Sequence, residues 1–455
     1  MPSSPERVAA IILAAGKGTR MKSALPKVMH KIAGRSMIGH VLANLAPLQP
    51  QRVVAVIAPD MDPVRQEVAP LPVAIQAEQL GTAHAVRCAR EAMGAQAGTV
   101  LILFGDTPFV ATATLRKLVE RRAAKDEPAV VVLGMRPADA GAYGRLVLDR
   151  QGDLERIVEF KEASATERAI TLCNSGVMAV DGAILWTLLD LIRNDNAKGE
   201  YYLTDIVALA RADGRNCAVV EAPEAELLGV NSRAELAIAE ALYQGQRRAE
   251  AMEGGATLLD PGSVFFAADT KLGRDVVVGP NVVFGAGVTV ADEVEIRAFC
   301  HIEGASIEKG AVIGPFARLR PGARIGAGAH IGNFVEVKNS NVGEGAKANH
   351  LSYLGDADIG ARSNIGAGTI TCNYDGVLKA RTEIGAEAFI GSNASLVAPV
   401  SIGAGAIVGA GSVITRDVEA DAIAVARGEQ VSRAGRAKEF RARRQKQKQQ
   451  KPEIR

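Results

Sequence analysis

Residues 384–414 read IGAEAFIGSNASLVAPVSIGAGAIVGAGSVI, and a large apolar residue recurs there at every sixth position. These residues are Ile384, Ile390, Leu396, Ile402, Val408 and Ile414. Glycine, alanine and serine are frequent between them. A period of six with small residues at the corners is typical of a parallel β-helix, in which the apolar side chain fills the interior. We therefore predict a β-helix for this part of the chain.

The same period extends towards the N-terminus. Apolar residues recur at Leu272, Val278, Phe284, Val290, Ile296 and Ile302, and after a slip of one residue at Ile307, Ile313, Leu319, Ile325, Ile331 and Val337. The period is broken over residues 342–358 and 371–383. A repeat protein gains nothing from such interruptions unless they build a site. We therefore expect functional residues in both breaks.

His350 lies in the first break, within the sequence ANHLSYLGD of residues 348–356. Most lone histidines are structural, and that alternative stays open. Imidazole titrates near neutral pH, however, and is the usual base for activating an amine nucleophile. The location of His350 favours the catalytic interpretation.

Residues 8–228 show a different pattern, in which apolar runs alternate with helical segments. We expect strands at residues 8–13, 53–58, 73–76, 99–104 and 129–133, with helices at residues 81–93 and 111–122. This alternation predicts an α/β domain with a mainly parallel sheet covered on both faces. Such sheets bind ligands beyond the carboxyl ends of their strands.

The sequence LAAGKGTRMKSALPK of residues 13–27 follows the first expected strand. Its two glycines allow backbone N–H groups to approach an anion. Lys17, Arg20 and Lys27 add three positive charges, so we expect a di- or triphosphate ligand. The spacing fits neither a Walker loop nor a dinucleotide fingerprint. An ordinary glycine turn with solvated cations is the alternative.

Asp106 comes just after the apolar strand expected at residues 99–104, within the sequence FGDTP. A carboxylate there is unfavourable unless another group satisfies it. Mg²⁺ that bridges substrate phosphates would do so, because its sites use one or two carboxylates plus substrate oxygens. A turn aspartate that caps the next helix is the alternative.

Composition indicates a cytoplasmic enzyme of two or more domains with no membrane span. The chain has 455 residues and a net charge of +2, which gives no global nucleic-acid signature. Positive charge gathers at residues 433–455, where we expect a solvated, disordered tail. The five cysteines form no metal or disulfide pattern, and the N-terminus has no basic signal-peptide region.

Residues 13–27 resemble the signature of sugar-1-phosphate nucleotidyltransferases. The chain outside the basic tail is similar to the bacterial bifunctional N-acetylglucosamine-1-phosphate uridyltransferase and glucosamine-1-phosphate N-acetyltransferase family, through residues 318–322, 333–338, 348–356 and 371–376. The resemblance implies acetyl transfer from acetyl-CoA to glucosamine-1-phosphate, followed by uridylyl transfer from UTP with release of pyrophosphate. The product, UDP-N-acetylglucosamine, would serve peptidoglycan and lipopolysaccharide synthesis.

The resemblance also implies a domain organisation. A Rossmann-like nucleotidyltransferase domain is expected over residues 1–231 and a left-handed parallel β-helix over residues 254–430. A linker helix is expected at residues 232–253, since Ser232 and Glu235 form a capping-box sequence. The tail would occupy residues 431–455. Enzymes of this type are homotrimers with active sites between neighbouring coils.

Site residues implied by the resemblance fall into four groups. For the nucleotide and sugar they are Leu13, Ala14, Ala15, Gly16, Arg20, Lys27, Gln76, Gly81, Thr82, Gly144, Glu159, Asn174 and Asn231. The Mg²⁺ ligands are Asp106 and Asn231. The glucosamine phosphate would meet Arg320, Lys338, Tyr353, Asn364 and Lys379. Acetyl-CoA would meet Ala367, Asn373, Tyr374, Ser392, Ala410 and Arg427, with His350 as the catalytic base.

The chain departs from the family pattern at two places, with Phe104 where tyrosine is common and Ser175 where threonine is common.

Two other functions compete with the function that the resemblance implies. In the first, the β-helix serves only to form trimers, and smooth coils without breaks are expected. A zinc hydratase of the β-helix type would use His301, His330 and His350, although their spacings differ.

Overall fold

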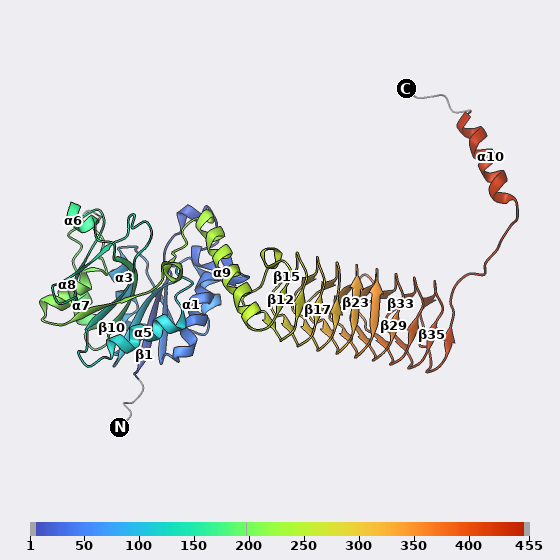
Figure 1. Ribbon diagram of the computed structural model, residues 1–455, viewed down its shortest axis with the longest axis horizontal. Helices are drawn as coiled ribbons and strands as arrows, with labels where there is room; N and C mark the ends of the chain where they lie inside the picture. The colour runs from blue at the N-terminus through green and yellow to red at the C-terminus, as the bar shows by residue number, and fades with distance from the viewer. Residues whose placement is uncertain (1–5, 197, 450–455) are drawn as a thin grey trace. The chain divides into compact units, whose positions relative to one another are not determined.

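A computed structural model describes residues 6–196 and 198–449, which form two compact units (Figure 1). The first unit holds the described residues up to Glu250 together with Phe265–Ala268. The second holds Ala251–Val264 and the described residues from Asp269 onward.

The first unit is built on a nine-stranded sheet whose main order is β11-β7-β10-β6-β1-β4-β5. Strands β1, β4, β5 and β6 are parallel, whereas β10 runs antiparallel to β6 and β7. The strands are β1 (Val8–Leu13), β4 (Arg52–Ile57), β5 (Val73–Ile75), β6 (Thr99–Phe104), β7 (Val130–Met135), β8 (Arg145–Leu148), β9 (Leu154–Val158), β10 (Cys173–Asp181) and β11 (Cys217–Glu221). A separate hairpin joins β2 (Lys31–Ile32) and β3 (Arg35–Ser36).

Both faces of this sheet are buried. Along β1, Ile11 packs into one hydrophobic core and Ile12 into the other, as alternating side chains of a strand must. The covering helices are α1 (Met37–Leu45), α2 (Asp62–Val68), α3 (Thr82–Cys88), α4 (Arg90–Met93), α5 (Thr112–Arg122), α6 (Ala165–Arg168), α7 (Leu185–Leu191) and α8 (Asp205–Ala212). The helix predicted at residues 81–93 is thus two helices, α3 and α4. The predicted α/β fold is confirmed.

Helix α9 (Arg233–Glu253) begins with the predicted capping box. The Glu235 amide donates to Ser232 Oγ at 3.2 Å, and Glu235 Oε2 accepts from the Ser232 amide at 3.0 Å. Through Glu250 the helix belongs to the first unit, where Ala239 is buried against Ile32 and Met37.

The second unit is a parallel β-helix of three sheets, and the predicted fold is confirmed there too. The first sheet contains β12 (Thr257–Leu258), β14 (Val277–Val278), β17 (Glu295–Ile296), β20 (Val312–Ile313), β23 (His330–Asn333), β26 (Lys347–His350), β29 (Asn364–Ile365), β32 (Phe389–Ile390), β35 (Ile407–Val408) and β37 (Ile423–Ala424). The second contains β13 (Lys271–Leu272), β16 (Thr289–Val290), β19 (Ser306–Ile307), β22 (Arg324–Ile325), β25 (Asn341–Val342), β28 (Ala357–Ile359), β31 (Thr382–Ile384) and β34 (Val400–Ile402). The third contains β15 (Val283–Phe284), β18 (His301–Ile302), β21 (Arg318–Leu319), β24 (Glu336–Lys338), β27 (Tyr353–Gly355), β30 (Ile370–Cys372), β33 (Ser395–Val397) and β36 (Val413–Ile414).

The break predicted at residues 342–358 does not exist in the structure. Strands β25 to β28 continue all three sheets in register. The coil interior is filled by Ala348 and Leu354, and Ala348 pairs with Ile331 on one side and Ile365 on the other. The apolar period appeared to stop because an alanine occupies an interior position.

The second break, at residues 371–383, is a true insertion. Arg362 and Glu387, which lie on neighbouring coils, are 25 residues apart, whereas Glu383 and Ser401 on the next pair are 18 apart. The extra residues form a loop closed by an antiparallel bridge between Tyr374 and Lys379.

The basic tail contains helix α10 (Arg436–Gln449), and every described side chain of this helix is exposed. The sequence predicted no regular structure there. The helix is explained by alanine, arginine, lysine and glutamine, which favour helices. Among the described residues, no helix is long and apolar enough to cross a membrane.

Candidate active sites

A cavity of about 320 Å³ opens in the first unit beside the carboxyl ends of β1 and β6. Nine of the predicted residues line it, namely Leu13, Ala14, Ala15, Gly16, Lys27, Gln76, Gly81, Thr82 and Asp106. Val28, Gln79, Ala85, Phe104 and Glu200 complete the lining. The structure therefore brings together residues from segments that lie far apart in the sequence.

The glycine-rich loop forms one wall of this cavity. A Cβ atom on Gly16 would meet nothing within 4 Å, so the backbone there faces open space. Gly18 has φ +60°, and a Cβ at this position would lie 2.6 Å from Lys27 Cβ. Gly18 is therefore required where the loop approaches Lys27. Arg20 is exposed and does not line the cavity.

Lys27 joins the two predicted metal ligands. Its ammonium contacts Asp106 Oδ2 and also donates to Asn231 Oδ1 at 2.9 Å. The Lys27 and Asp106 side chains are only 13% and 19% exposed. A carboxylate and an amide oxygen thus converge on one cationic atom. This donor set suits Mg²⁺, which completes its coordination with substrate oxygens and water.

Gly81 and Thr82 form another wall of the cavity. Gly81 has φ +110°, and a Cβ there would lie 2.5 Å from the backbone oxygen of Tyr201. Thr82 Oγ1 accepts from the amide of Leu203 at 3.0 Å, and Gln76 donates to the Gly81 carbonyl at 3.1 Å. These contacts fix the start of α3 at the cavity wall.

Of the predicted residues outside this cavity lining, three lie on or directly beside strands β8, β9 and β10, namely Gly144, Glu159 and Asn174. The Asn174 amide donates to the Gly144 carbonyl at 2.9 Å, and Glu159 follows β9 directly. Burial raises the pKa of the Glu159 carboxyl above its usual value. Asn174 and Gly144 are therefore adjacent to each other, but none of the three lines the cavity beside the glycine-rich loop.

The departures from the family pattern have structural explanations. Ser175 Oγ donates to the Leu133 carbonyl at 2.6 Å, so this hydroxyl is engaged with the backbone. The Phe104 ring packs against Gly176, where a Cβ would approach within 2.9 Å. The sequence analysis missed Gln79, whose side-chain amide donates to the Ala15 carbonyl, although it lies between the predicted Gln76 and Gly81.

Three of the predicted acetyl-CoA positions form a column in the β-helix. Ala367, Ser392 and Ala410 each lie two residues after an interior residue of the first sheet, and those interior residues pair in register. Arg427 Nη1 donates to the Ala410 carbonyl at 2.7 Å. Ser392, Ala410 and Arg427 are exposed, so this column is open to a ligand.

Two of the predicted sugar-phosphate positions, Arg320 and Lys338, lie at the ends of third-sheet strands, and Lys379 lies in the inserted loop. Partial burial of the Asp356 carboxyl favours its neutral form. Hydrogen bonds from Asn339 and Asn373 outweigh this effect and, with Lys338 and Lys379 nearby, hold the pKa of the carboxyl below its usual value. Asn373 itself is buried by that contact.

The other members of this group lie on strands or beside them. Arg320 donates to Glu336 Oε1 at 2.8 Å, and Glu336 pairs with Tyr353 in the sheet. Asn364 lies on β29 in the first sheet. Tyr374, which was predicted for acetyl-CoA, is exposed in the inserted loop. Lysines and an arginine therefore accumulate around the ends of β21, β24 and the insertion, as a phosphate ligand requires.

His350 ends β26 and is exposed on the outside of a regular coil, not in an insertion. Its Nδ1 lies 2.6 Å from Asn333 Oδ1, and the two residues pair across the sheet. With Nδ1–H donating to this oxygen, Nε2 is the proton acceptor of the neutral ring. The placement of His350 therefore suits a base. The reason is its exposure and its contact with Asn333, and not a break in the repeat as predicted.

The three histidines of the zinc alternative do not share one sheet: His301 lies on β18 and His330 on β23. Over residues 6–196 and 198–449, no three His, Cys, Asp or Glu side chains are grouped to hold a metal ion. This geometry gives the zinc alternative no support.

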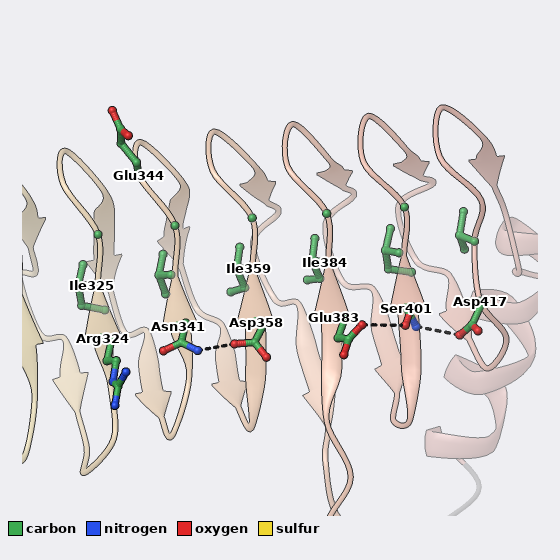
Figure 2. Close-up of a pocket in the computed structure, with 18 of the residues that line it drawn as sticks. Arg324, Ile325, Asn341, Glu344, Asp358, Ile359, Glu383, Ile384, Ser401 and Asp417 are labelled. Carbon is green, nitrogen blue, oxygen red and sulfur yellow. Dashed lines mark hydrogen bonds between the residues drawn. The ribbon is translucent and has the colours of Figure 1, made fainter.

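A hollow of about 930 Å³ runs along the second sheet of the β-helix (Figure 2). Polar side chains follow its strands. Asn341 donates to Asp358, and the Ser401 amide donates to Asp417 at 2.8 Å. None of the predicted acetyltransferase residues lines it. Its size therefore does not identify it as the acetyl-transfer site.

Comparisons with known proteins agree with this division of the chain. Residues 10–171 match the family model of the MobA-like NTP transferase domain. Residues 269–304, 304–339 and 381–416 match the model of the bacterial transferase hexapeptide in six repeats.

Full-length relatives are similar throughout. "Bifunctional protein GlmU" of Rhodospirillum rubrum is 64% identical over 96% of this chain and 98% of its own. The protein of the same name from Paramagnetospirillum magneticum is 59% identical over 96% and 97%, and that from Rhizorhabdus wittichii 64% over 95% and 96%. The chain therefore belongs to the family of bifunctional GlmU proteins, which confirms the predicted family.

Proposed function

We propose that the chain is a bifunctional enzyme of UDP-N-acetylglucosamine synthesis. The β-helix transfers an acetyl group from acetyl-CoA to glucosamine-1-phosphate. The first unit then transfers a uridylyl group from UTP to N-acetylglucosamine-1-phosphate and releases pyrophosphate. The observation that carries this proposal is the cavity that unites the glycine-rich loop, Lys27, Gly81 and Asp106.

In the first unit, a phosphate oxygen of the sugar attacks the α-phosphorus of UTP, and the bond to pyrophosphate breaks. The Gly16 backbone and the Lys27 ammonium meet the triphosphate and offset its negative charge. Asp106 and Asn231 would hold Mg²⁺, which supplies further positive charge to the reacting phosphates. Gly144, Glu159 and Asn174, on or beside β8, β9 and β10, receive the sugar.

In the β-helix, the sugar amine attacks the thioester carbon. A C–N bond forms, and the C–S electrons leave with the thiolate of coenzyme A. An ammonium has no lone pair, so His350 Nε2 takes a proton before or during attack. Asn333 holds the ring through Nδ1 at 2.6 Å. The column of Ala367, Ser392 and Ala410 carries coenzyme A.

The active form is a homotrimer in this proposal. Phe299, Phe316 and Phe334 stack with ring centroids 4.9 and 5.2 Å apart, yet 45–55% of each residue is exposed. An exposed ridge of this kind marks an association surface. The three phenylalanines come shortly after strands β17, β20 and β23 of the first sheet, as the coenzyme column comes after β29, β32 and β35 of the same sheet. A neighbouring copy would therefore cover both.

The domain limits follow from the same proposal. Residues 1–231 form the uridyltransferase domain, 232–253 the linker helix, 254–430 the acetyltransferase domain and 431–455 the basic tail.

A coupled assay tests the function. The purified protein, supplied with glucosamine-1-phosphate, acetyl-CoA, UTP and Mg²⁺, should form UDP-N-acetylglucosamine. Omission of acetyl-CoA should stop the reaction, and addition of N-acetylglucosamine-1-phosphate should restore it. A protein that makes the product only from the acetylated sugar would carry a β-helix without acetyltransferase activity.

A further inference from the structure

The Lys27 ammonium occupies the point where the Asp106 and Asn231 oxygens converge. It contacts Asp106 Oδ2 and lies 2.9 Å from Asn231 Oδ1. The side chains of Lys27 and Asp106 are largely buried, so this ion pair is partly shielded from water. A partly buried carboxylate that loses its partner is strongly destabilised. Lys27 therefore supplies the positive charge that Asp106 needs when no other cation is present.

The two oxygen ligands are held in place independently of Lys27. The Val230 amide donates to the Asp106 carbonyl at 3.0 Å, which ties the end of β6 to the segment that precedes α9. The Asn231 amide donates to Glu235 Oε2 at 2.6 Å in the first turn of that helix. The backbone at both ligand residues is thus held without Lys27, and the cation between their side chains is the exchangeable part.

The Lys27 side chain starts beside the phosphate loop. Its Cβ is so close to Gly18 that a Cβ on the glycine would lie 2.6 Å away. From there the side chain extends to Asp106, and both Lys27 and Asp106 line the cavity. Rotation about its four side-chain bonds can return the ammonium to the loop without movement of the backbone.

We propose that Lys27 is a built-in substitute for the metal ion, which neutralises Asp106 in the free protein and moves to the nucleotide phosphates when the metal enters. This inference rests on the proposed uridyltransferase function. Metal entry without nucleotide would place two cations against one carboxylate. The triphosphate offers the ammonium a new anionic partner, so metal and nucleotide bind cooperatively and the free protein binds metal weakly.

Binding of Mn²⁺ to the full-length protein, followed by calorimetry or by the electron paramagnetic resonance of free Mn²⁺, tests this proposal. Lys27→Met removes the competing charge at similar length. It should tighten Mn²⁺ binding in the absence of UTP by about tenfold or more, which corresponds to ~1.4 kcal/mol. Lys27→Gln should do the same, and serves if the Met variant does not fold. Lys27→Arg keeps the charge and should bind Mn²⁺ as weakly as the parent.

Lys22→Met is the matched control, because Lys22 is an exposed lysine of the same loop, and it should leave Mn²⁺ binding unchanged. Unchanged or weaker Mn²⁺ binding by Lys27→Met and Lys27→Gln would overturn the inference. A failure of the proposed function is seen differently. If the parent protein with UTP binds no Mn²⁺, or if Asp106→Asn does not abolish that binding, the proposed metal site itself is wrong.

Discussion

Asp106 is a largely buried carboxylate just after an apolar strand, and its environment explains why it should matter for the reaction. Its partners are one lysine and, in the proposed function, Mg²⁺ and the phosphates. Asp106→Ala should therefore lower uridylyl transfer by on the order of a hundredfold or more, the usual size of a lost electrostatic contact in an active site. Acetyl transfer should remain at the parent rate.

Separate assays of the two half-reactions measure this effect. Asp60→Ala is the control, since Asp60 is an exposed carboxylate beside a neighbouring hollow of the same unit. It should leave both rates unchanged. Full uridylyl transfer by Asp106→Ala would remove Asp106 from the mechanism.

His350 is the corresponding residue of the β-helix. His350→Ala should lower acetyl transfer by roughly two to four orders of magnitude, the range of a lost general base. Because the side chain lies on the outside of the coil, folding and uridylyl transfer should not change. His330→Ala removes an exposed histidine from the same sheet and should have no effect. Equal acetyl-transfer rates for both variants would make His350 a structural residue.

How far individual residues could be predicted depends on distance along the chain. Gly16, Lys27 and Asp106 were predictable from motifs that come after expected strands, because strand ends meet at one sheet edge. Gly81 came only from the family resemblance. The ion pair of Lys27 with Asp106 was not, since 79 residues separate the two and either alone indicates a phosphate or metal ligand. Asn333 beside His350 was missed for the same reason.

At the scale of elements, the coils of the β-helix stack so closely that some corners exclude any side chain. A Cβ on Gly343 would lie 2.6 Å from the Ala361 nitrogen of the next coil. Gly343→Ala should therefore lower the free energy of unfolding by about 1–3 kcal/mol, as overpacking does. Gly245 in helix α9 has open space around it, and Gly245→Ala should raise stability by about 1 kcal/mol. Denaturant unfolding measures both. Similar effects for the two variants would contradict the role of coil stacking.

Element prediction succeeded where one physical pattern dominated. The aliphatic period identified the β-helix, because each coil needs a large apolar side chain on every face. It failed at residues 342–358, where Ala348 occupies the interior of the coil. The length of the coil is the better signal. Asn341 and Asp358 are 17 residues apart, close to the ordinary value, whereas the true insertion gives 25.

At the scale of the whole molecule, the nucleotide cavity lies in one compact unit and the acetyltransferase residues lie in the other. In the structure, no predicted uridyltransferase residue belongs to the β-helix unit. The two activities should therefore be separable by point substitutions, each of which removes one reaction and leaves the other.

A mixture of the two inactive variants tests this separation. Asp106→Ala should still make N-acetylglucosamine-1-phosphate, and His350→Ala should still convert it to UDP-N-acetylglucosamine. An equal mixture, supplied with glucosamine-1-phosphate, acetyl-CoA and UTP, should form the final product after a lag, because the intermediate must first accumulate in solution. Each variant alone should form little or none. If the mixture stays inactive while both half-reactions proceed, the intermediate does not reach the second site through solvent, and the two units act as one catalytic assembly.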